Sequence, residues 1–413
     1  MKPGYKQTEI GVIPEDWEVT SIIDCCDYAD YRGKTPPKTQ SGTFLVTARN
    51  VRKGFIDYVD SQEYVPSALY DQIMRRGKPR IGDVLITTEA PLGNVAQIDR
   101  EDVALAQRII KYRPKIDDLS STYLKHYFLS DRFQQILDDH SSGSTAKGIK
   151  GGVLHKLPVA LPPLPEQRAI ASALSDVDGL LGALDRLIAK KRDLKQAAMQ
   201  QLLTGQTRLP GFHGEWVTKK LGELFEITSS KRVFQSEWKS EGIPFYRARE
   251  LAVLGETGRV DNELFVSRAL YDSFRTAHGV PEVGDMLVTG VGTLGKVYVV
   301  RNEEEFYFKD GNIIWFKIRG SVSAEFLRQL YLTNVVMKQI TDGSAGTTVG
   351  TYTISGAKKT EIPVPPLHEQ TAIAGVLSDM DAELAALEER REKTRALKQG
   401  MMQELLTGRI RLG

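Results

Sequence analysis

Two stretches of the chain repeat an apolar residue at every third or fourth position, the spacing of one face of an α-helix. Each stretch opens on a Pro-Pro pair followed by Glu-Gln, at residues 166–167 and 369–370, and prolines and a carboxylate favour the first turn of a helix. Each ends at a glycine, Gly205 or Gly408, a residue that commonly terminates helices. The pattern predicts two helices of roughly 40 residues, each about 60 Å long at 1.5 Å per residue. The apolar positions are Ile170, Leu174, Val177, Leu181, Leu184, Ile188, Leu194, Ala198 and Leu202, and Ile373, Leu377, Met380, Leu384, Leu387, Leu397, Met401 and Leu405.

Helices of this length have too few neighbours in their own segments to bury an apolar stripe. The simplest solution is that they pack on each other as a coiled coil. The chain between them leads from the end of the first helix to the start of the second, which favours an antiparallel pair. Two amphipathic helices in separate cores remain the alternative, but that arrangement does not explain why the helices are the best-matched part of an internal repeat.

The repeat is visible in the letters of the sequence. PPLPEQRAIASALSDVD at 162–178 matches PPLHEQTAIAGVLSDMD at 365–381, and LKQAAMQQLLTGQTRL at 194–209 matches LKQGMMQELLTGRIRL at 397–412. A fainter match, one residue out of step with these, joins IGDVLITTEAPLGNVAQI, starting at Ile81, to VGDMLVTGVGTLGKVYVV, starting at Val283. Nearly constant offsets indicate one colinear duplication.

The duplication divides the chain into four blocks that alternate between variable and constant sequence. We predict a first variable domain over 1–160, a first long helix within 161–209, a second variable domain over 210–363 and a second long helix within 364–413. The variable blocks mix short β-rich runs, such as GDVLIT and GDMLVT, with helical patterns such as STYLKHYFLSDRFQQIL. The predicted fold class is α+β, with two similar α/β domains, two long helices and a pseudo-two-fold internal repeat.

One glycine pattern imitates a nucleotide-binding loop. Residues 290–297, GVGTLGKV, satisfy GxGxxG and nearly satisfy the P-loop pattern. That fingerprint requires a helix after it, whereas VYVV follows here and predicts a strand. The duplicate copy, TEAPLGN at 88–94, also lacks the first two glycines and the lysine. We interpret the segment as a tight β-turn.

Cysteine usage and hydropathy limit the cellular compartment and the kinds of metal or membrane site that the sequence allows. The only cysteines, Cys25 and Cys26, are adjacent, which excludes a disulfide scaffold and the spacings of zinc modules. The N-terminus lacks the apolar segment of a signal peptide, and no apolar run is long enough to cross a membrane. We therefore expect a cytoplasmic protein without a membrane or metal site.

Charge and motifs argue against a self-contained enzyme and against a globally basic protein. Residues 1–160 carry 22 Lys and Arg against 21 Asp and Glu, and residues 210–363 carry 19 of each. Any basic surface must therefore be local. The six histidines form no HExxH, no GxSxG precedes a plausible triad, and no Asn-Pro-Pro-aromatic methyltransferase motif occurs. We expect no catalytic residues in this chain.

The order of blocks, the PPLxEQxAIAxxLSDxD helix starts and the LLTGxxRL helix ends closely resemble the specificity (S) subunits of type I restriction-modification systems. The resemblance covers essentially the whole chain. It implies that each variable domain is a target recognition domain reading one half of a bipartite sequence in double-stranded DNA. It also implies that the helices space the halves and dock two methyltransferase (M) subunits, which restriction (R) subunits join. S-adenosylmethionine, ATP and Mg²⁺ would then bind the partner subunits, and none would bind this chain.

Candidate DNA contacts are basic residues at matched or loop positions and hydroxyls in glycine-rich loops, because guanidinium groups grip guanine or phosphate. Arg49 and Arg249 are equivalent in the repeat, although a shared structural ion pair would also explain the match. The remaining candidates are Lys34, Lys38, Arg75, Arg76, Lys78, Arg80, Ser144, Thr145, Lys147, Lys150, Lys231, Arg232, Ser344 and Thr347. Any one of these lysines or arginines taken alone is equally well explained as a solvated surface residue.

For partner docking we expect Glu166, Gln167, Glu369 and Gln370 with the outward helix faces, although helix capping explains the same four residues. Trp17 and Trp216 are interpreted as core anchors. Two other classes of function stay open at this point. One is a structural coiled-coil adaptor without DNA binding, and the other is a self-contained restriction-modification enzyme.

Overall fold

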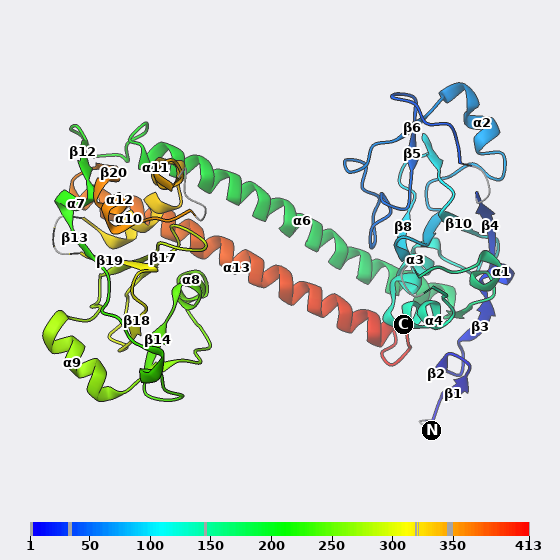
Figure 1. The fold of residues 1–413 in the computed structure, drawn as a ribbon. Helices are drawn as coiled ribbons and strands as arrows, with labels where there is room; N and C mark the ends of the chain where they lie inside the picture. Colours follow the sequence, from blue (N-terminus) through cyan, green and yellow to red (C-terminus); the bar gives the residue numbers. More distant parts are fainter. Residues whose placement is uncertain are drawn as a thin grey trace. The chain divides into compact units, whose positions relative to one another are not determined.

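The structure is a computed structural model that describes residues 3–31, 35–143, 147–318, 320, 322–344 and 350–412. It divides into two compact units, residues 1–185 with 389–413, and residues 186–388. Each unit holds one variable domain, the beginning of one long helix and the end of the other (Figure 1).

The two predicted long helices are confirmed. Helix α6 spans Leu164–Leu203 and helix α13 spans Leu367–Leu405, inside the blocks expected for them. Beyond their ends, Gly205 and Gly408 have φ of 73° and 71°, the left-handed conformation that glycine adopts without steric cost. A Cβ at Gly408 would lie 2.4 Å from Pro14, so a larger residue there would clash with the first domain.

Within each unit the helices run antiparallel, as predicted. In the first unit Asp178 pairs with Lys398 at 2.6 Å and Asp185 with Arg391 at 3.4 Å, so residue numbers rise on one helix as they fall on the other. The second unit repeats this order, because Lys191 pairs with Glu383 and Lys195 with Asp381. The helices share the apolar core of each unit, where Leu174 packs with Leu405 in the first and Leu202 with Leu377 in the second.

One detail of the predicted stripe is wrong. Leu194 and Leu397 are 47% and 59% exposed and do not lie in the seam between the helices. Their neighbours Lys195 and Lys398 take the inward positions, where each reaches an aspartate of the opposite helix. Ion pairs therefore replace apolar contacts at this turn of both helices.

The first domain contains two sheets. Its four-stranded antiparallel sheet has the order β4-β10-β7-β8, and its three-stranded sheet has the order β6-β5-β9, with β5 and β9 parallel. Helices α3 (Ser121–Leu129) and α4 (Asp131–Asp139) cover the larger sheet, with Phe128 and Phe133 in the core. The strands are β4 Cys26–Asp30, β5 Thr43–Val46, β6 Tyr64–Val65, β7 Val84–Thr88, β8 Leu92–Gln97, β9 Val103–Leu105 and β10 Ile109–Pro114.

The second domain repeats this topology. Its sheets have the orders β13-β19-β16-β17 and β15-β14-β18, with β14 and β18 parallel. Helices α10 (Ala324–Tyr331) and α11 (Asn334–Ser344) correspond to α3 and α4 of the first domain. The α+β duplication is therefore confirmed at the level of strand order. The strands are β13 Glu226–Thr228, β14 Ile243–Tyr246, β15 Phe265–Val266, β16 Met286–Thr289, β17 Val297–Val299, β18 Tyr307–Phe308 and β19 Ile313–Lys317.

Short elements complete both units and attach the domains to the long helices. In the first unit β3 pairs with β11 just before α6, and in the second β12 pairs with β20 just before α13. They are β1 Tyr5–Thr8, β2 Gly11–Pro14, β3 Glu18–Ser21, α1 Ile22–Cys25, α2 Tyr70–Ile73, α5 Gly151–Leu154, β11 Pro158–Leu161, β12 Val217–Lys220, α7 Leu221–Leu224, α8 Ala248–Thr257, α9 Arg268–His278, α12 Ile354–Lys359 and β20 Glu361–Val364, with 3-10 turns at Ser67–Leu69 and Gln235–Glu237.

The glycine pattern at 290–297 forms the tight turn that its sequence predicted. It connects β16 to β17, and Thr289 exchanges backbone hydrogen bonds with Gly295 and Lys296 at 2.9 Å. A strand follows the turn, so the helix that a phosphate-binding loop requires is replaced by β17. Among the residues that the structure describes, no helix combines the length and the apolar character needed to span a membrane.

Candidate nucleic-acid interface

Arg49 and Arg249 occupy the same place in the two domains. Each lies three residues beyond the central strand of its three-stranded sheet, β5 or β14, and each side chain is exposed. Neither forms an ion pair or hydrogen bond with another described residue. The shared ion pair considered from the sequence is therefore absent from the described part of the chain, and both guanidinium groups face solvent.

The turn that carries each arginine is fixed by a residue that the sequence did not single out. The buried Asn50 accepts a hydrogen bond from the Thr47 amide at 2.9 Å, and its own amide group donates to the backbone at residues 57 and 60. At the matching place Glu250 accepts from the Arg247 amide at 3.0 Å. In both copies the side chain of one residue thus accepts a hydrogen bond from the backbone amide three residues before it, which fixes the turn as a helix cap does.

Arg49 lines a cavity of about 270 Å³ in the first unit. Lys38, Gln107 and Arg108 line it as well, and Glu63 contributes a carboxylate that pairs with Lys38 at 2.7 Å. Most of the lining comes from the loop before β5, the turn after β5 and the loop after β9. The structure thus brings the predicted residues Lys38 and Arg49 together and adds Gln107 and Arg108, which sequence reasoning missed.

A second cavity, of about 260 Å³, adjoins the first, since Thr35 and Pro36 line both. Arg75 and Arg76 line this second cavity, and both are exposed. Arg76 donates to the Asp30 carbonyl at 2.5 Å. Two residues of the predicted basic run, Arg75 and Arg76, therefore line a cavity that adjoins the one lined by Arg49.

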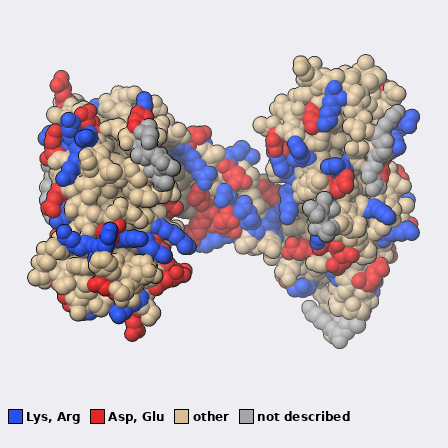
Figure 2. Space-filling model, in the orientation of Figure 1, with Lys and Arg blue, Asp and Glu red and all other residues tan. Residues whose placement is uncertain are grey.

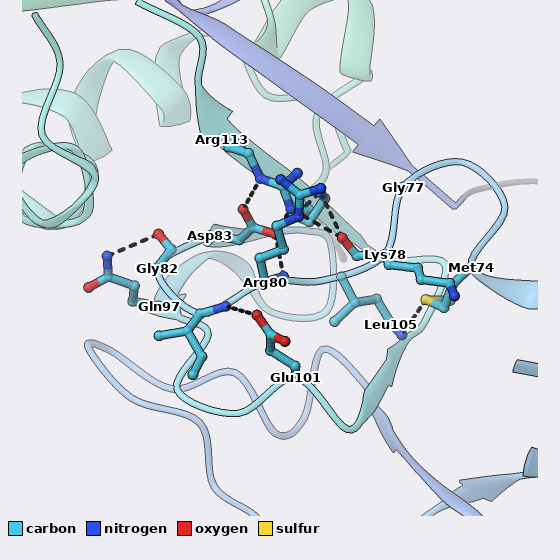
Figure 3. Close-up of polar contacts among 12 residues, drawn as sticks. Met74, Gly77, Lys78, Arg80, Gly82, Asp83, Gln97, Glu101, Leu105 and Arg113 are labelled. Atoms are coloured by element: carbon cyan, nitrogen blue, oxygen red, sulfur yellow. Dashed lines mark hydrogen bonds and ion pairs between the residues drawn. The ribbon is translucent and has the colours of Figure 1, made fainter. Parts of the chain in front are cut away.

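The basic run is held in place by one buried carboxylate (Figure 3). Asp83 accepts hydrogen bonds from the Arg113 guanidinium at 2.7 and 2.8 Å and from the Arg80 amide at 2.8 Å. Arg113 also donates to the Lys78 carbonyl at 3.2 Å. Lys111 lies 3.3 Å from Asp83, and burial lowers the pKa of its ammonium group. The cluster fixes the backbone of the run while its side chains remain exposed, although Lys78 pairs with an aspartate at 2.6 Å.

The glycine-rich loop of the first domain lies next to the cavity that holds Arg49. Gly148 forms a β-bridge with Glu89, and Glu89 pairs with Arg108 at 2.9 Å. Lys147 pairs with Asp138 at 2.6 Å, and Lys150 precedes helix α5. Three further predicted residues, Lys34, Ser144 and Thr145, lie outside the described residues.

The predicted basic residues of the second domain, Lys231 and Arg232, lie in the loop that follows β13. Arg232 is 69% exposed on its side chain and pairs with Asp310 at 3.2 Å. The backbone amide of Lys231 donates to the Tyr307 hydroxyl at 2.9 Å, which anchors this loop to β18. Of the remaining predicted residues, Thr347 lies outside the described residues, and Ser344 ends α11 with its side chain outside them.

Acidic and basic side chains are mixed over both units. Figure 2 shows them alternating along the long helices, while a row of Lys and Arg crosses the visible face of the second domain. This mixture agrees with the near-equal charge counts of the two variable blocks. Any attraction for a polyanion must come from local groups such as those around Arg49.

The residues predicted to dock a partner are buried instead. Gln167 and Gln370 have no exposed surface, and Glu166 and Glu369 are 5% and 0% exposed. Gln167 accepts from the Ser120 amide at 3.0 Å, and Gln370 accepts from the matching Ser323 amide at 2.9 Å. They join the start of each long helix to the start of α3 or α10. Direct partner contact by these four residues stays a prediction, and their burial gives it no support.

Glu166 and Glu369 each accept hydrogen bonds from one arginine and one tryptophan, Arg411 and Trp17 or Arg208 and Trp216, and we call each set of three residues a clamp. Arg208 binds Glu369 with two hydrogen bonds, at 2.5 and 2.6 Å, and the Trp216 indole donates to the same carboxylate at 3.2 Å. In the first unit Trp17 donates to Glu166 at 3.1 Å and is fully buried, which confirms it as a core anchor. Trp216 is only half-buried, packed between Arg208 and the core.

A groove of about 580 Å³ lies on the first unit between α4 and the end of α13. Arg132, Arg395, Lys398 and Arg409 line it together with Met402. Arg132 is half-buried and forms no ion pair with any other described residue. The groove is lined mainly by basic and polar side chains, with Met402 and Leu406 among its apolar residues.

Comparison with known proteins agrees with this architecture. The family described as type I restriction modification DNA specificity domain matches residues 14–190 and again residues 213–396. The putative type I restriction enzyme MjaX specificity subunit of Methanocaldococcus jannaschii is 25% identical over 99% of this chain and 97% of its own length. The MjaVIII specificity subunit of the same organism is 22% identical over 97% and 94%.

Solved structures share the fold. The type I restriction-modification S subunit from M. genitalium superimposes with a TM-score of 0.59 at 17% identity, covering 98% of this chain and 99% of that one. At this identity the likeness concerns the fold alone. The family match, by contrast, accounts for most of the sequence, with one copy in each half. The chain belongs to the type I restriction-modification DNA specificity family.

Proposed function

We propose that this chain is the non-catalytic specificity subunit of a type I restriction-modification complex, and that each variable domain reads one half of a bipartite target in double-stranded DNA. One observation carries the proposal. Two domains of the same topology present an exposed arginine, Arg49 or Arg249, on the same pinned turn. A duplicated reader suits a target of two separate halves.

The physical basis is a match between an internal repeat and duplex DNA. Arginine forks bind phosphate or guanine through paired hydrogen bonds, and contacts to phosphate position a protein while contacts to base edges specify the sequence. Two readers on one pair of continuous helices would keep their half-sites a fixed number of base pairs apart. The bases between the halves would then go unread.

Catalysis in this proposal belongs to the partners. Two methyltransferase subunits would carry S-adenosylmethionine, and restriction subunits, where they join, would carry ATP and Mg²⁺. The assembly would work in the cytoplasm, where the DNA is.

Two matched leucines support docking on the helices. Leu194 and Leu397 are equivalent in the repeat, and both are exposed although neither packs in a core. Exposed leucines retained in both copies suit two identical partners, one on each unit. In the first unit the groove beside Arg132 would take a carboxylate of the same partner.

The test is a selection from random double-stranded DNA by the complex of this chain with its cognate methyltransferase subunits. We expect retained sequences to share two short motifs at a fixed separation, and Arg49→Glu to weaken retention. Because both readers are near neutral, the chain alone should bind weakly. Retention without sequence preference that Arg49→Glu leaves unchanged would support a structural adaptor. Methylation by the chain alone would support a self-contained enzyme.

A further inference from the structure

The loop that follows β9 in the first domain presents an amide with no partner. Gln107 is half-buried, lines the cavity beside Arg49, and forms no hydrogen bond with another described residue. Its neighbour Arg108 is occupied by Glu89 at 2.9 Å. A half-buried amide in a basic cavity has two donors and one acceptor oxygen to offer a ligand.

In both domains this loop lies between two equivalent backbone hydrogen bonds, but the loop itself differs between the domains. Residues 106–108 lie between a bond from the Ala106 amide to the Val46 carbonyl and one from the Thr88 amide to the Arg108 carbonyl, at 2.9 and 3.0 Å. Residues 309–312 lie between the matching bonds, at 2.9 and 2.8 Å. The flanking hydrogen bonds are equivalent in the two domains. The loops between them, AQR and KDGN, differ in length and in every side chain.

The contrast between shared and unshared groups suggests a division of labour. A group that both readers share, Arg49 or Arg249, serves both half-sites whatever their sequence, which suits phosphate. Groups that differ between the readers suit the bases, because a bipartite target with two different halves needs a different set of base contacts in each reader. In the second loop Asp310 is tied to Arg232 at 3.2 Å, whereas the Asn312 side chain has no partner among the described residues.

We propose that the loops at 106–108 and 309–312 determine the two half-sites, with the Gln107 and Asn312 amides each reading an adenine. A glutamine or asparagine amide pairs with adenine by donating to N7 and accepting from N6–H₂ in the major groove. The proposal rests on the proposed function and adds the residues that set each half-site. Arg49 and Arg249 hold the phosphates that bring the amides to the base edges.

The experiment is methylome sequencing of a host that expresses the full chain with its cognate methyltransferase subunits, for the wild type, Gln107→Ala and Gln107→Glu. In Gln107→Ala we expect the preference for adenine at one position of one half-site to fall by about ten-fold or more. Gln107→Glu should favour cytosine there, because a carboxylate accepts from cytosine N4. The other half-site should stay unchanged, which shows that the complex still assembles.

Two variants sharpen the result. Asn312→Ala should relax one adenine of the opposite half-site, and Arg49→Ala should lower methylation at all targets without changing the motif. A wild-type bipartite motif that all the loop variants preserve would overturn the inference and leave the proposed function intact. A wild type without a bipartite motif would overturn the proposed function itself.

Discussion

Arg411, near the end of the chain, holds the carboxylate of Glu166 at the start of helix α6 with two hydrogen bonds, at 2.6 and 2.8 Å. The side chain of Glu166 is only 6% exposed, and the pair with Arg411 raises the pKa of the guanidinium. The same contact recurs in the second unit between Arg208 and Glu369. In each unit the residues beyond one long helix are thereby fastened to the beginning of the other.

We expect Arg411→Ala to destabilise the first unit by about 2 to 3 kcal/mol, because it leaves a buried carboxylate without its cation. The value lies below the roughly 3 to 5 kcal/mol typical of breaking a buried pair, since Arg411 is 39% exposed and solvent screens it. Pulse-labelled hydrogen exchange in urea should show earlier exposure of strand β3. Arg409→Ala, which removes an exposed pair with Glu404, is the matched control. Equal behaviour of both variants would contradict a structural role for the clamp.

The long helices and the duplication could be predicted from sequence because both depend on local periodicity and on letters repeated at a fixed offset. The exposure of Leu194 and Leu397 could not, since which side of a wide stripe meets a neighbour depends on how two helices cross. The clamp was also missed: Trp17, Glu166 and Arg411 come from three distant segments, and their repetition as Trp216, Glu369 and Arg208 was the available signal.

The candidate interface also contains some residues that could be predicted from the sequence and others that could not. Arg49 could be singled out from sequence because Arg249 matches it in the repeat, and Arg75 and Arg76 because they belong to a dense basic run. Gln107 was missed because an isolated glutamine after a strand carries no pattern. Only the parallel pairing of β9 with β5 brings its loop to the turn that holds Arg49.

His126 predicts a loss of stability in mild acid. The ring is buried between α3 and the start of α6, where it contacts the Ser175 hydroxyl at 3.1 Å. Burial, with Lys125 and Lys398 nearby, lowers the pKa of His126 to about 2. Below about pH 6.5 this histidine is therefore protonated in the unfolded chain but stays neutral in the folded chain. The free energy of unfolding consequently decreases as the pH is lowered.

Between pH 7.5 and 5.5 this difference amounts to about 1.4 kcal/mol. His126→Gln should lose that share of the pH dependence, whatever its stability at neutral pH, when urea unfolding of the first unit is followed by hydrogen exchange in α3. The exposed His140→Gln serves as control. An identical pH dependence in wild type and His126→Gln would show that His126 does not titrate as its burial implies.

Docking of the methyltransferase subunits should depend on the matched leucines. We expect Leu397→Glu and Leu194→Glu each to remove one of two partner subunits, because a carboxylate replaces an apolar contact. Native mass spectrometry of the co-expressed complex reads the stoichiometry. Leu187→Glu is the control, since Leu187 is 39% exposed but its counterpart in the repeat is Arg390. A full complement of partners on the double variant would place docking elsewhere.

The helices should set the gap between the half-sites. Inserting four residues after Asp185 in α6 and four after Glu388 in α13, where one unit gives way to the other, adds about 6 Å to each helix. We expect the unread gap to lengthen by about one or two base pairs, at roughly 3.4 Å each, with both half-sites unchanged. A changed half-site would contradict the separation of spacer from readers.

If this chain gives a type I complex a bipartite target, mapping methylated adenines across the genome of a host that expresses it with its cognate methyltransferase subunits should reveal that target. We expect one motif of two short, different halves separated by a fixed run of unread bases. Deleting the second reader should abolish that motif. Methylation of a single continuous site, or of the same site without this chain, would show that this chain does not specify a bipartite target.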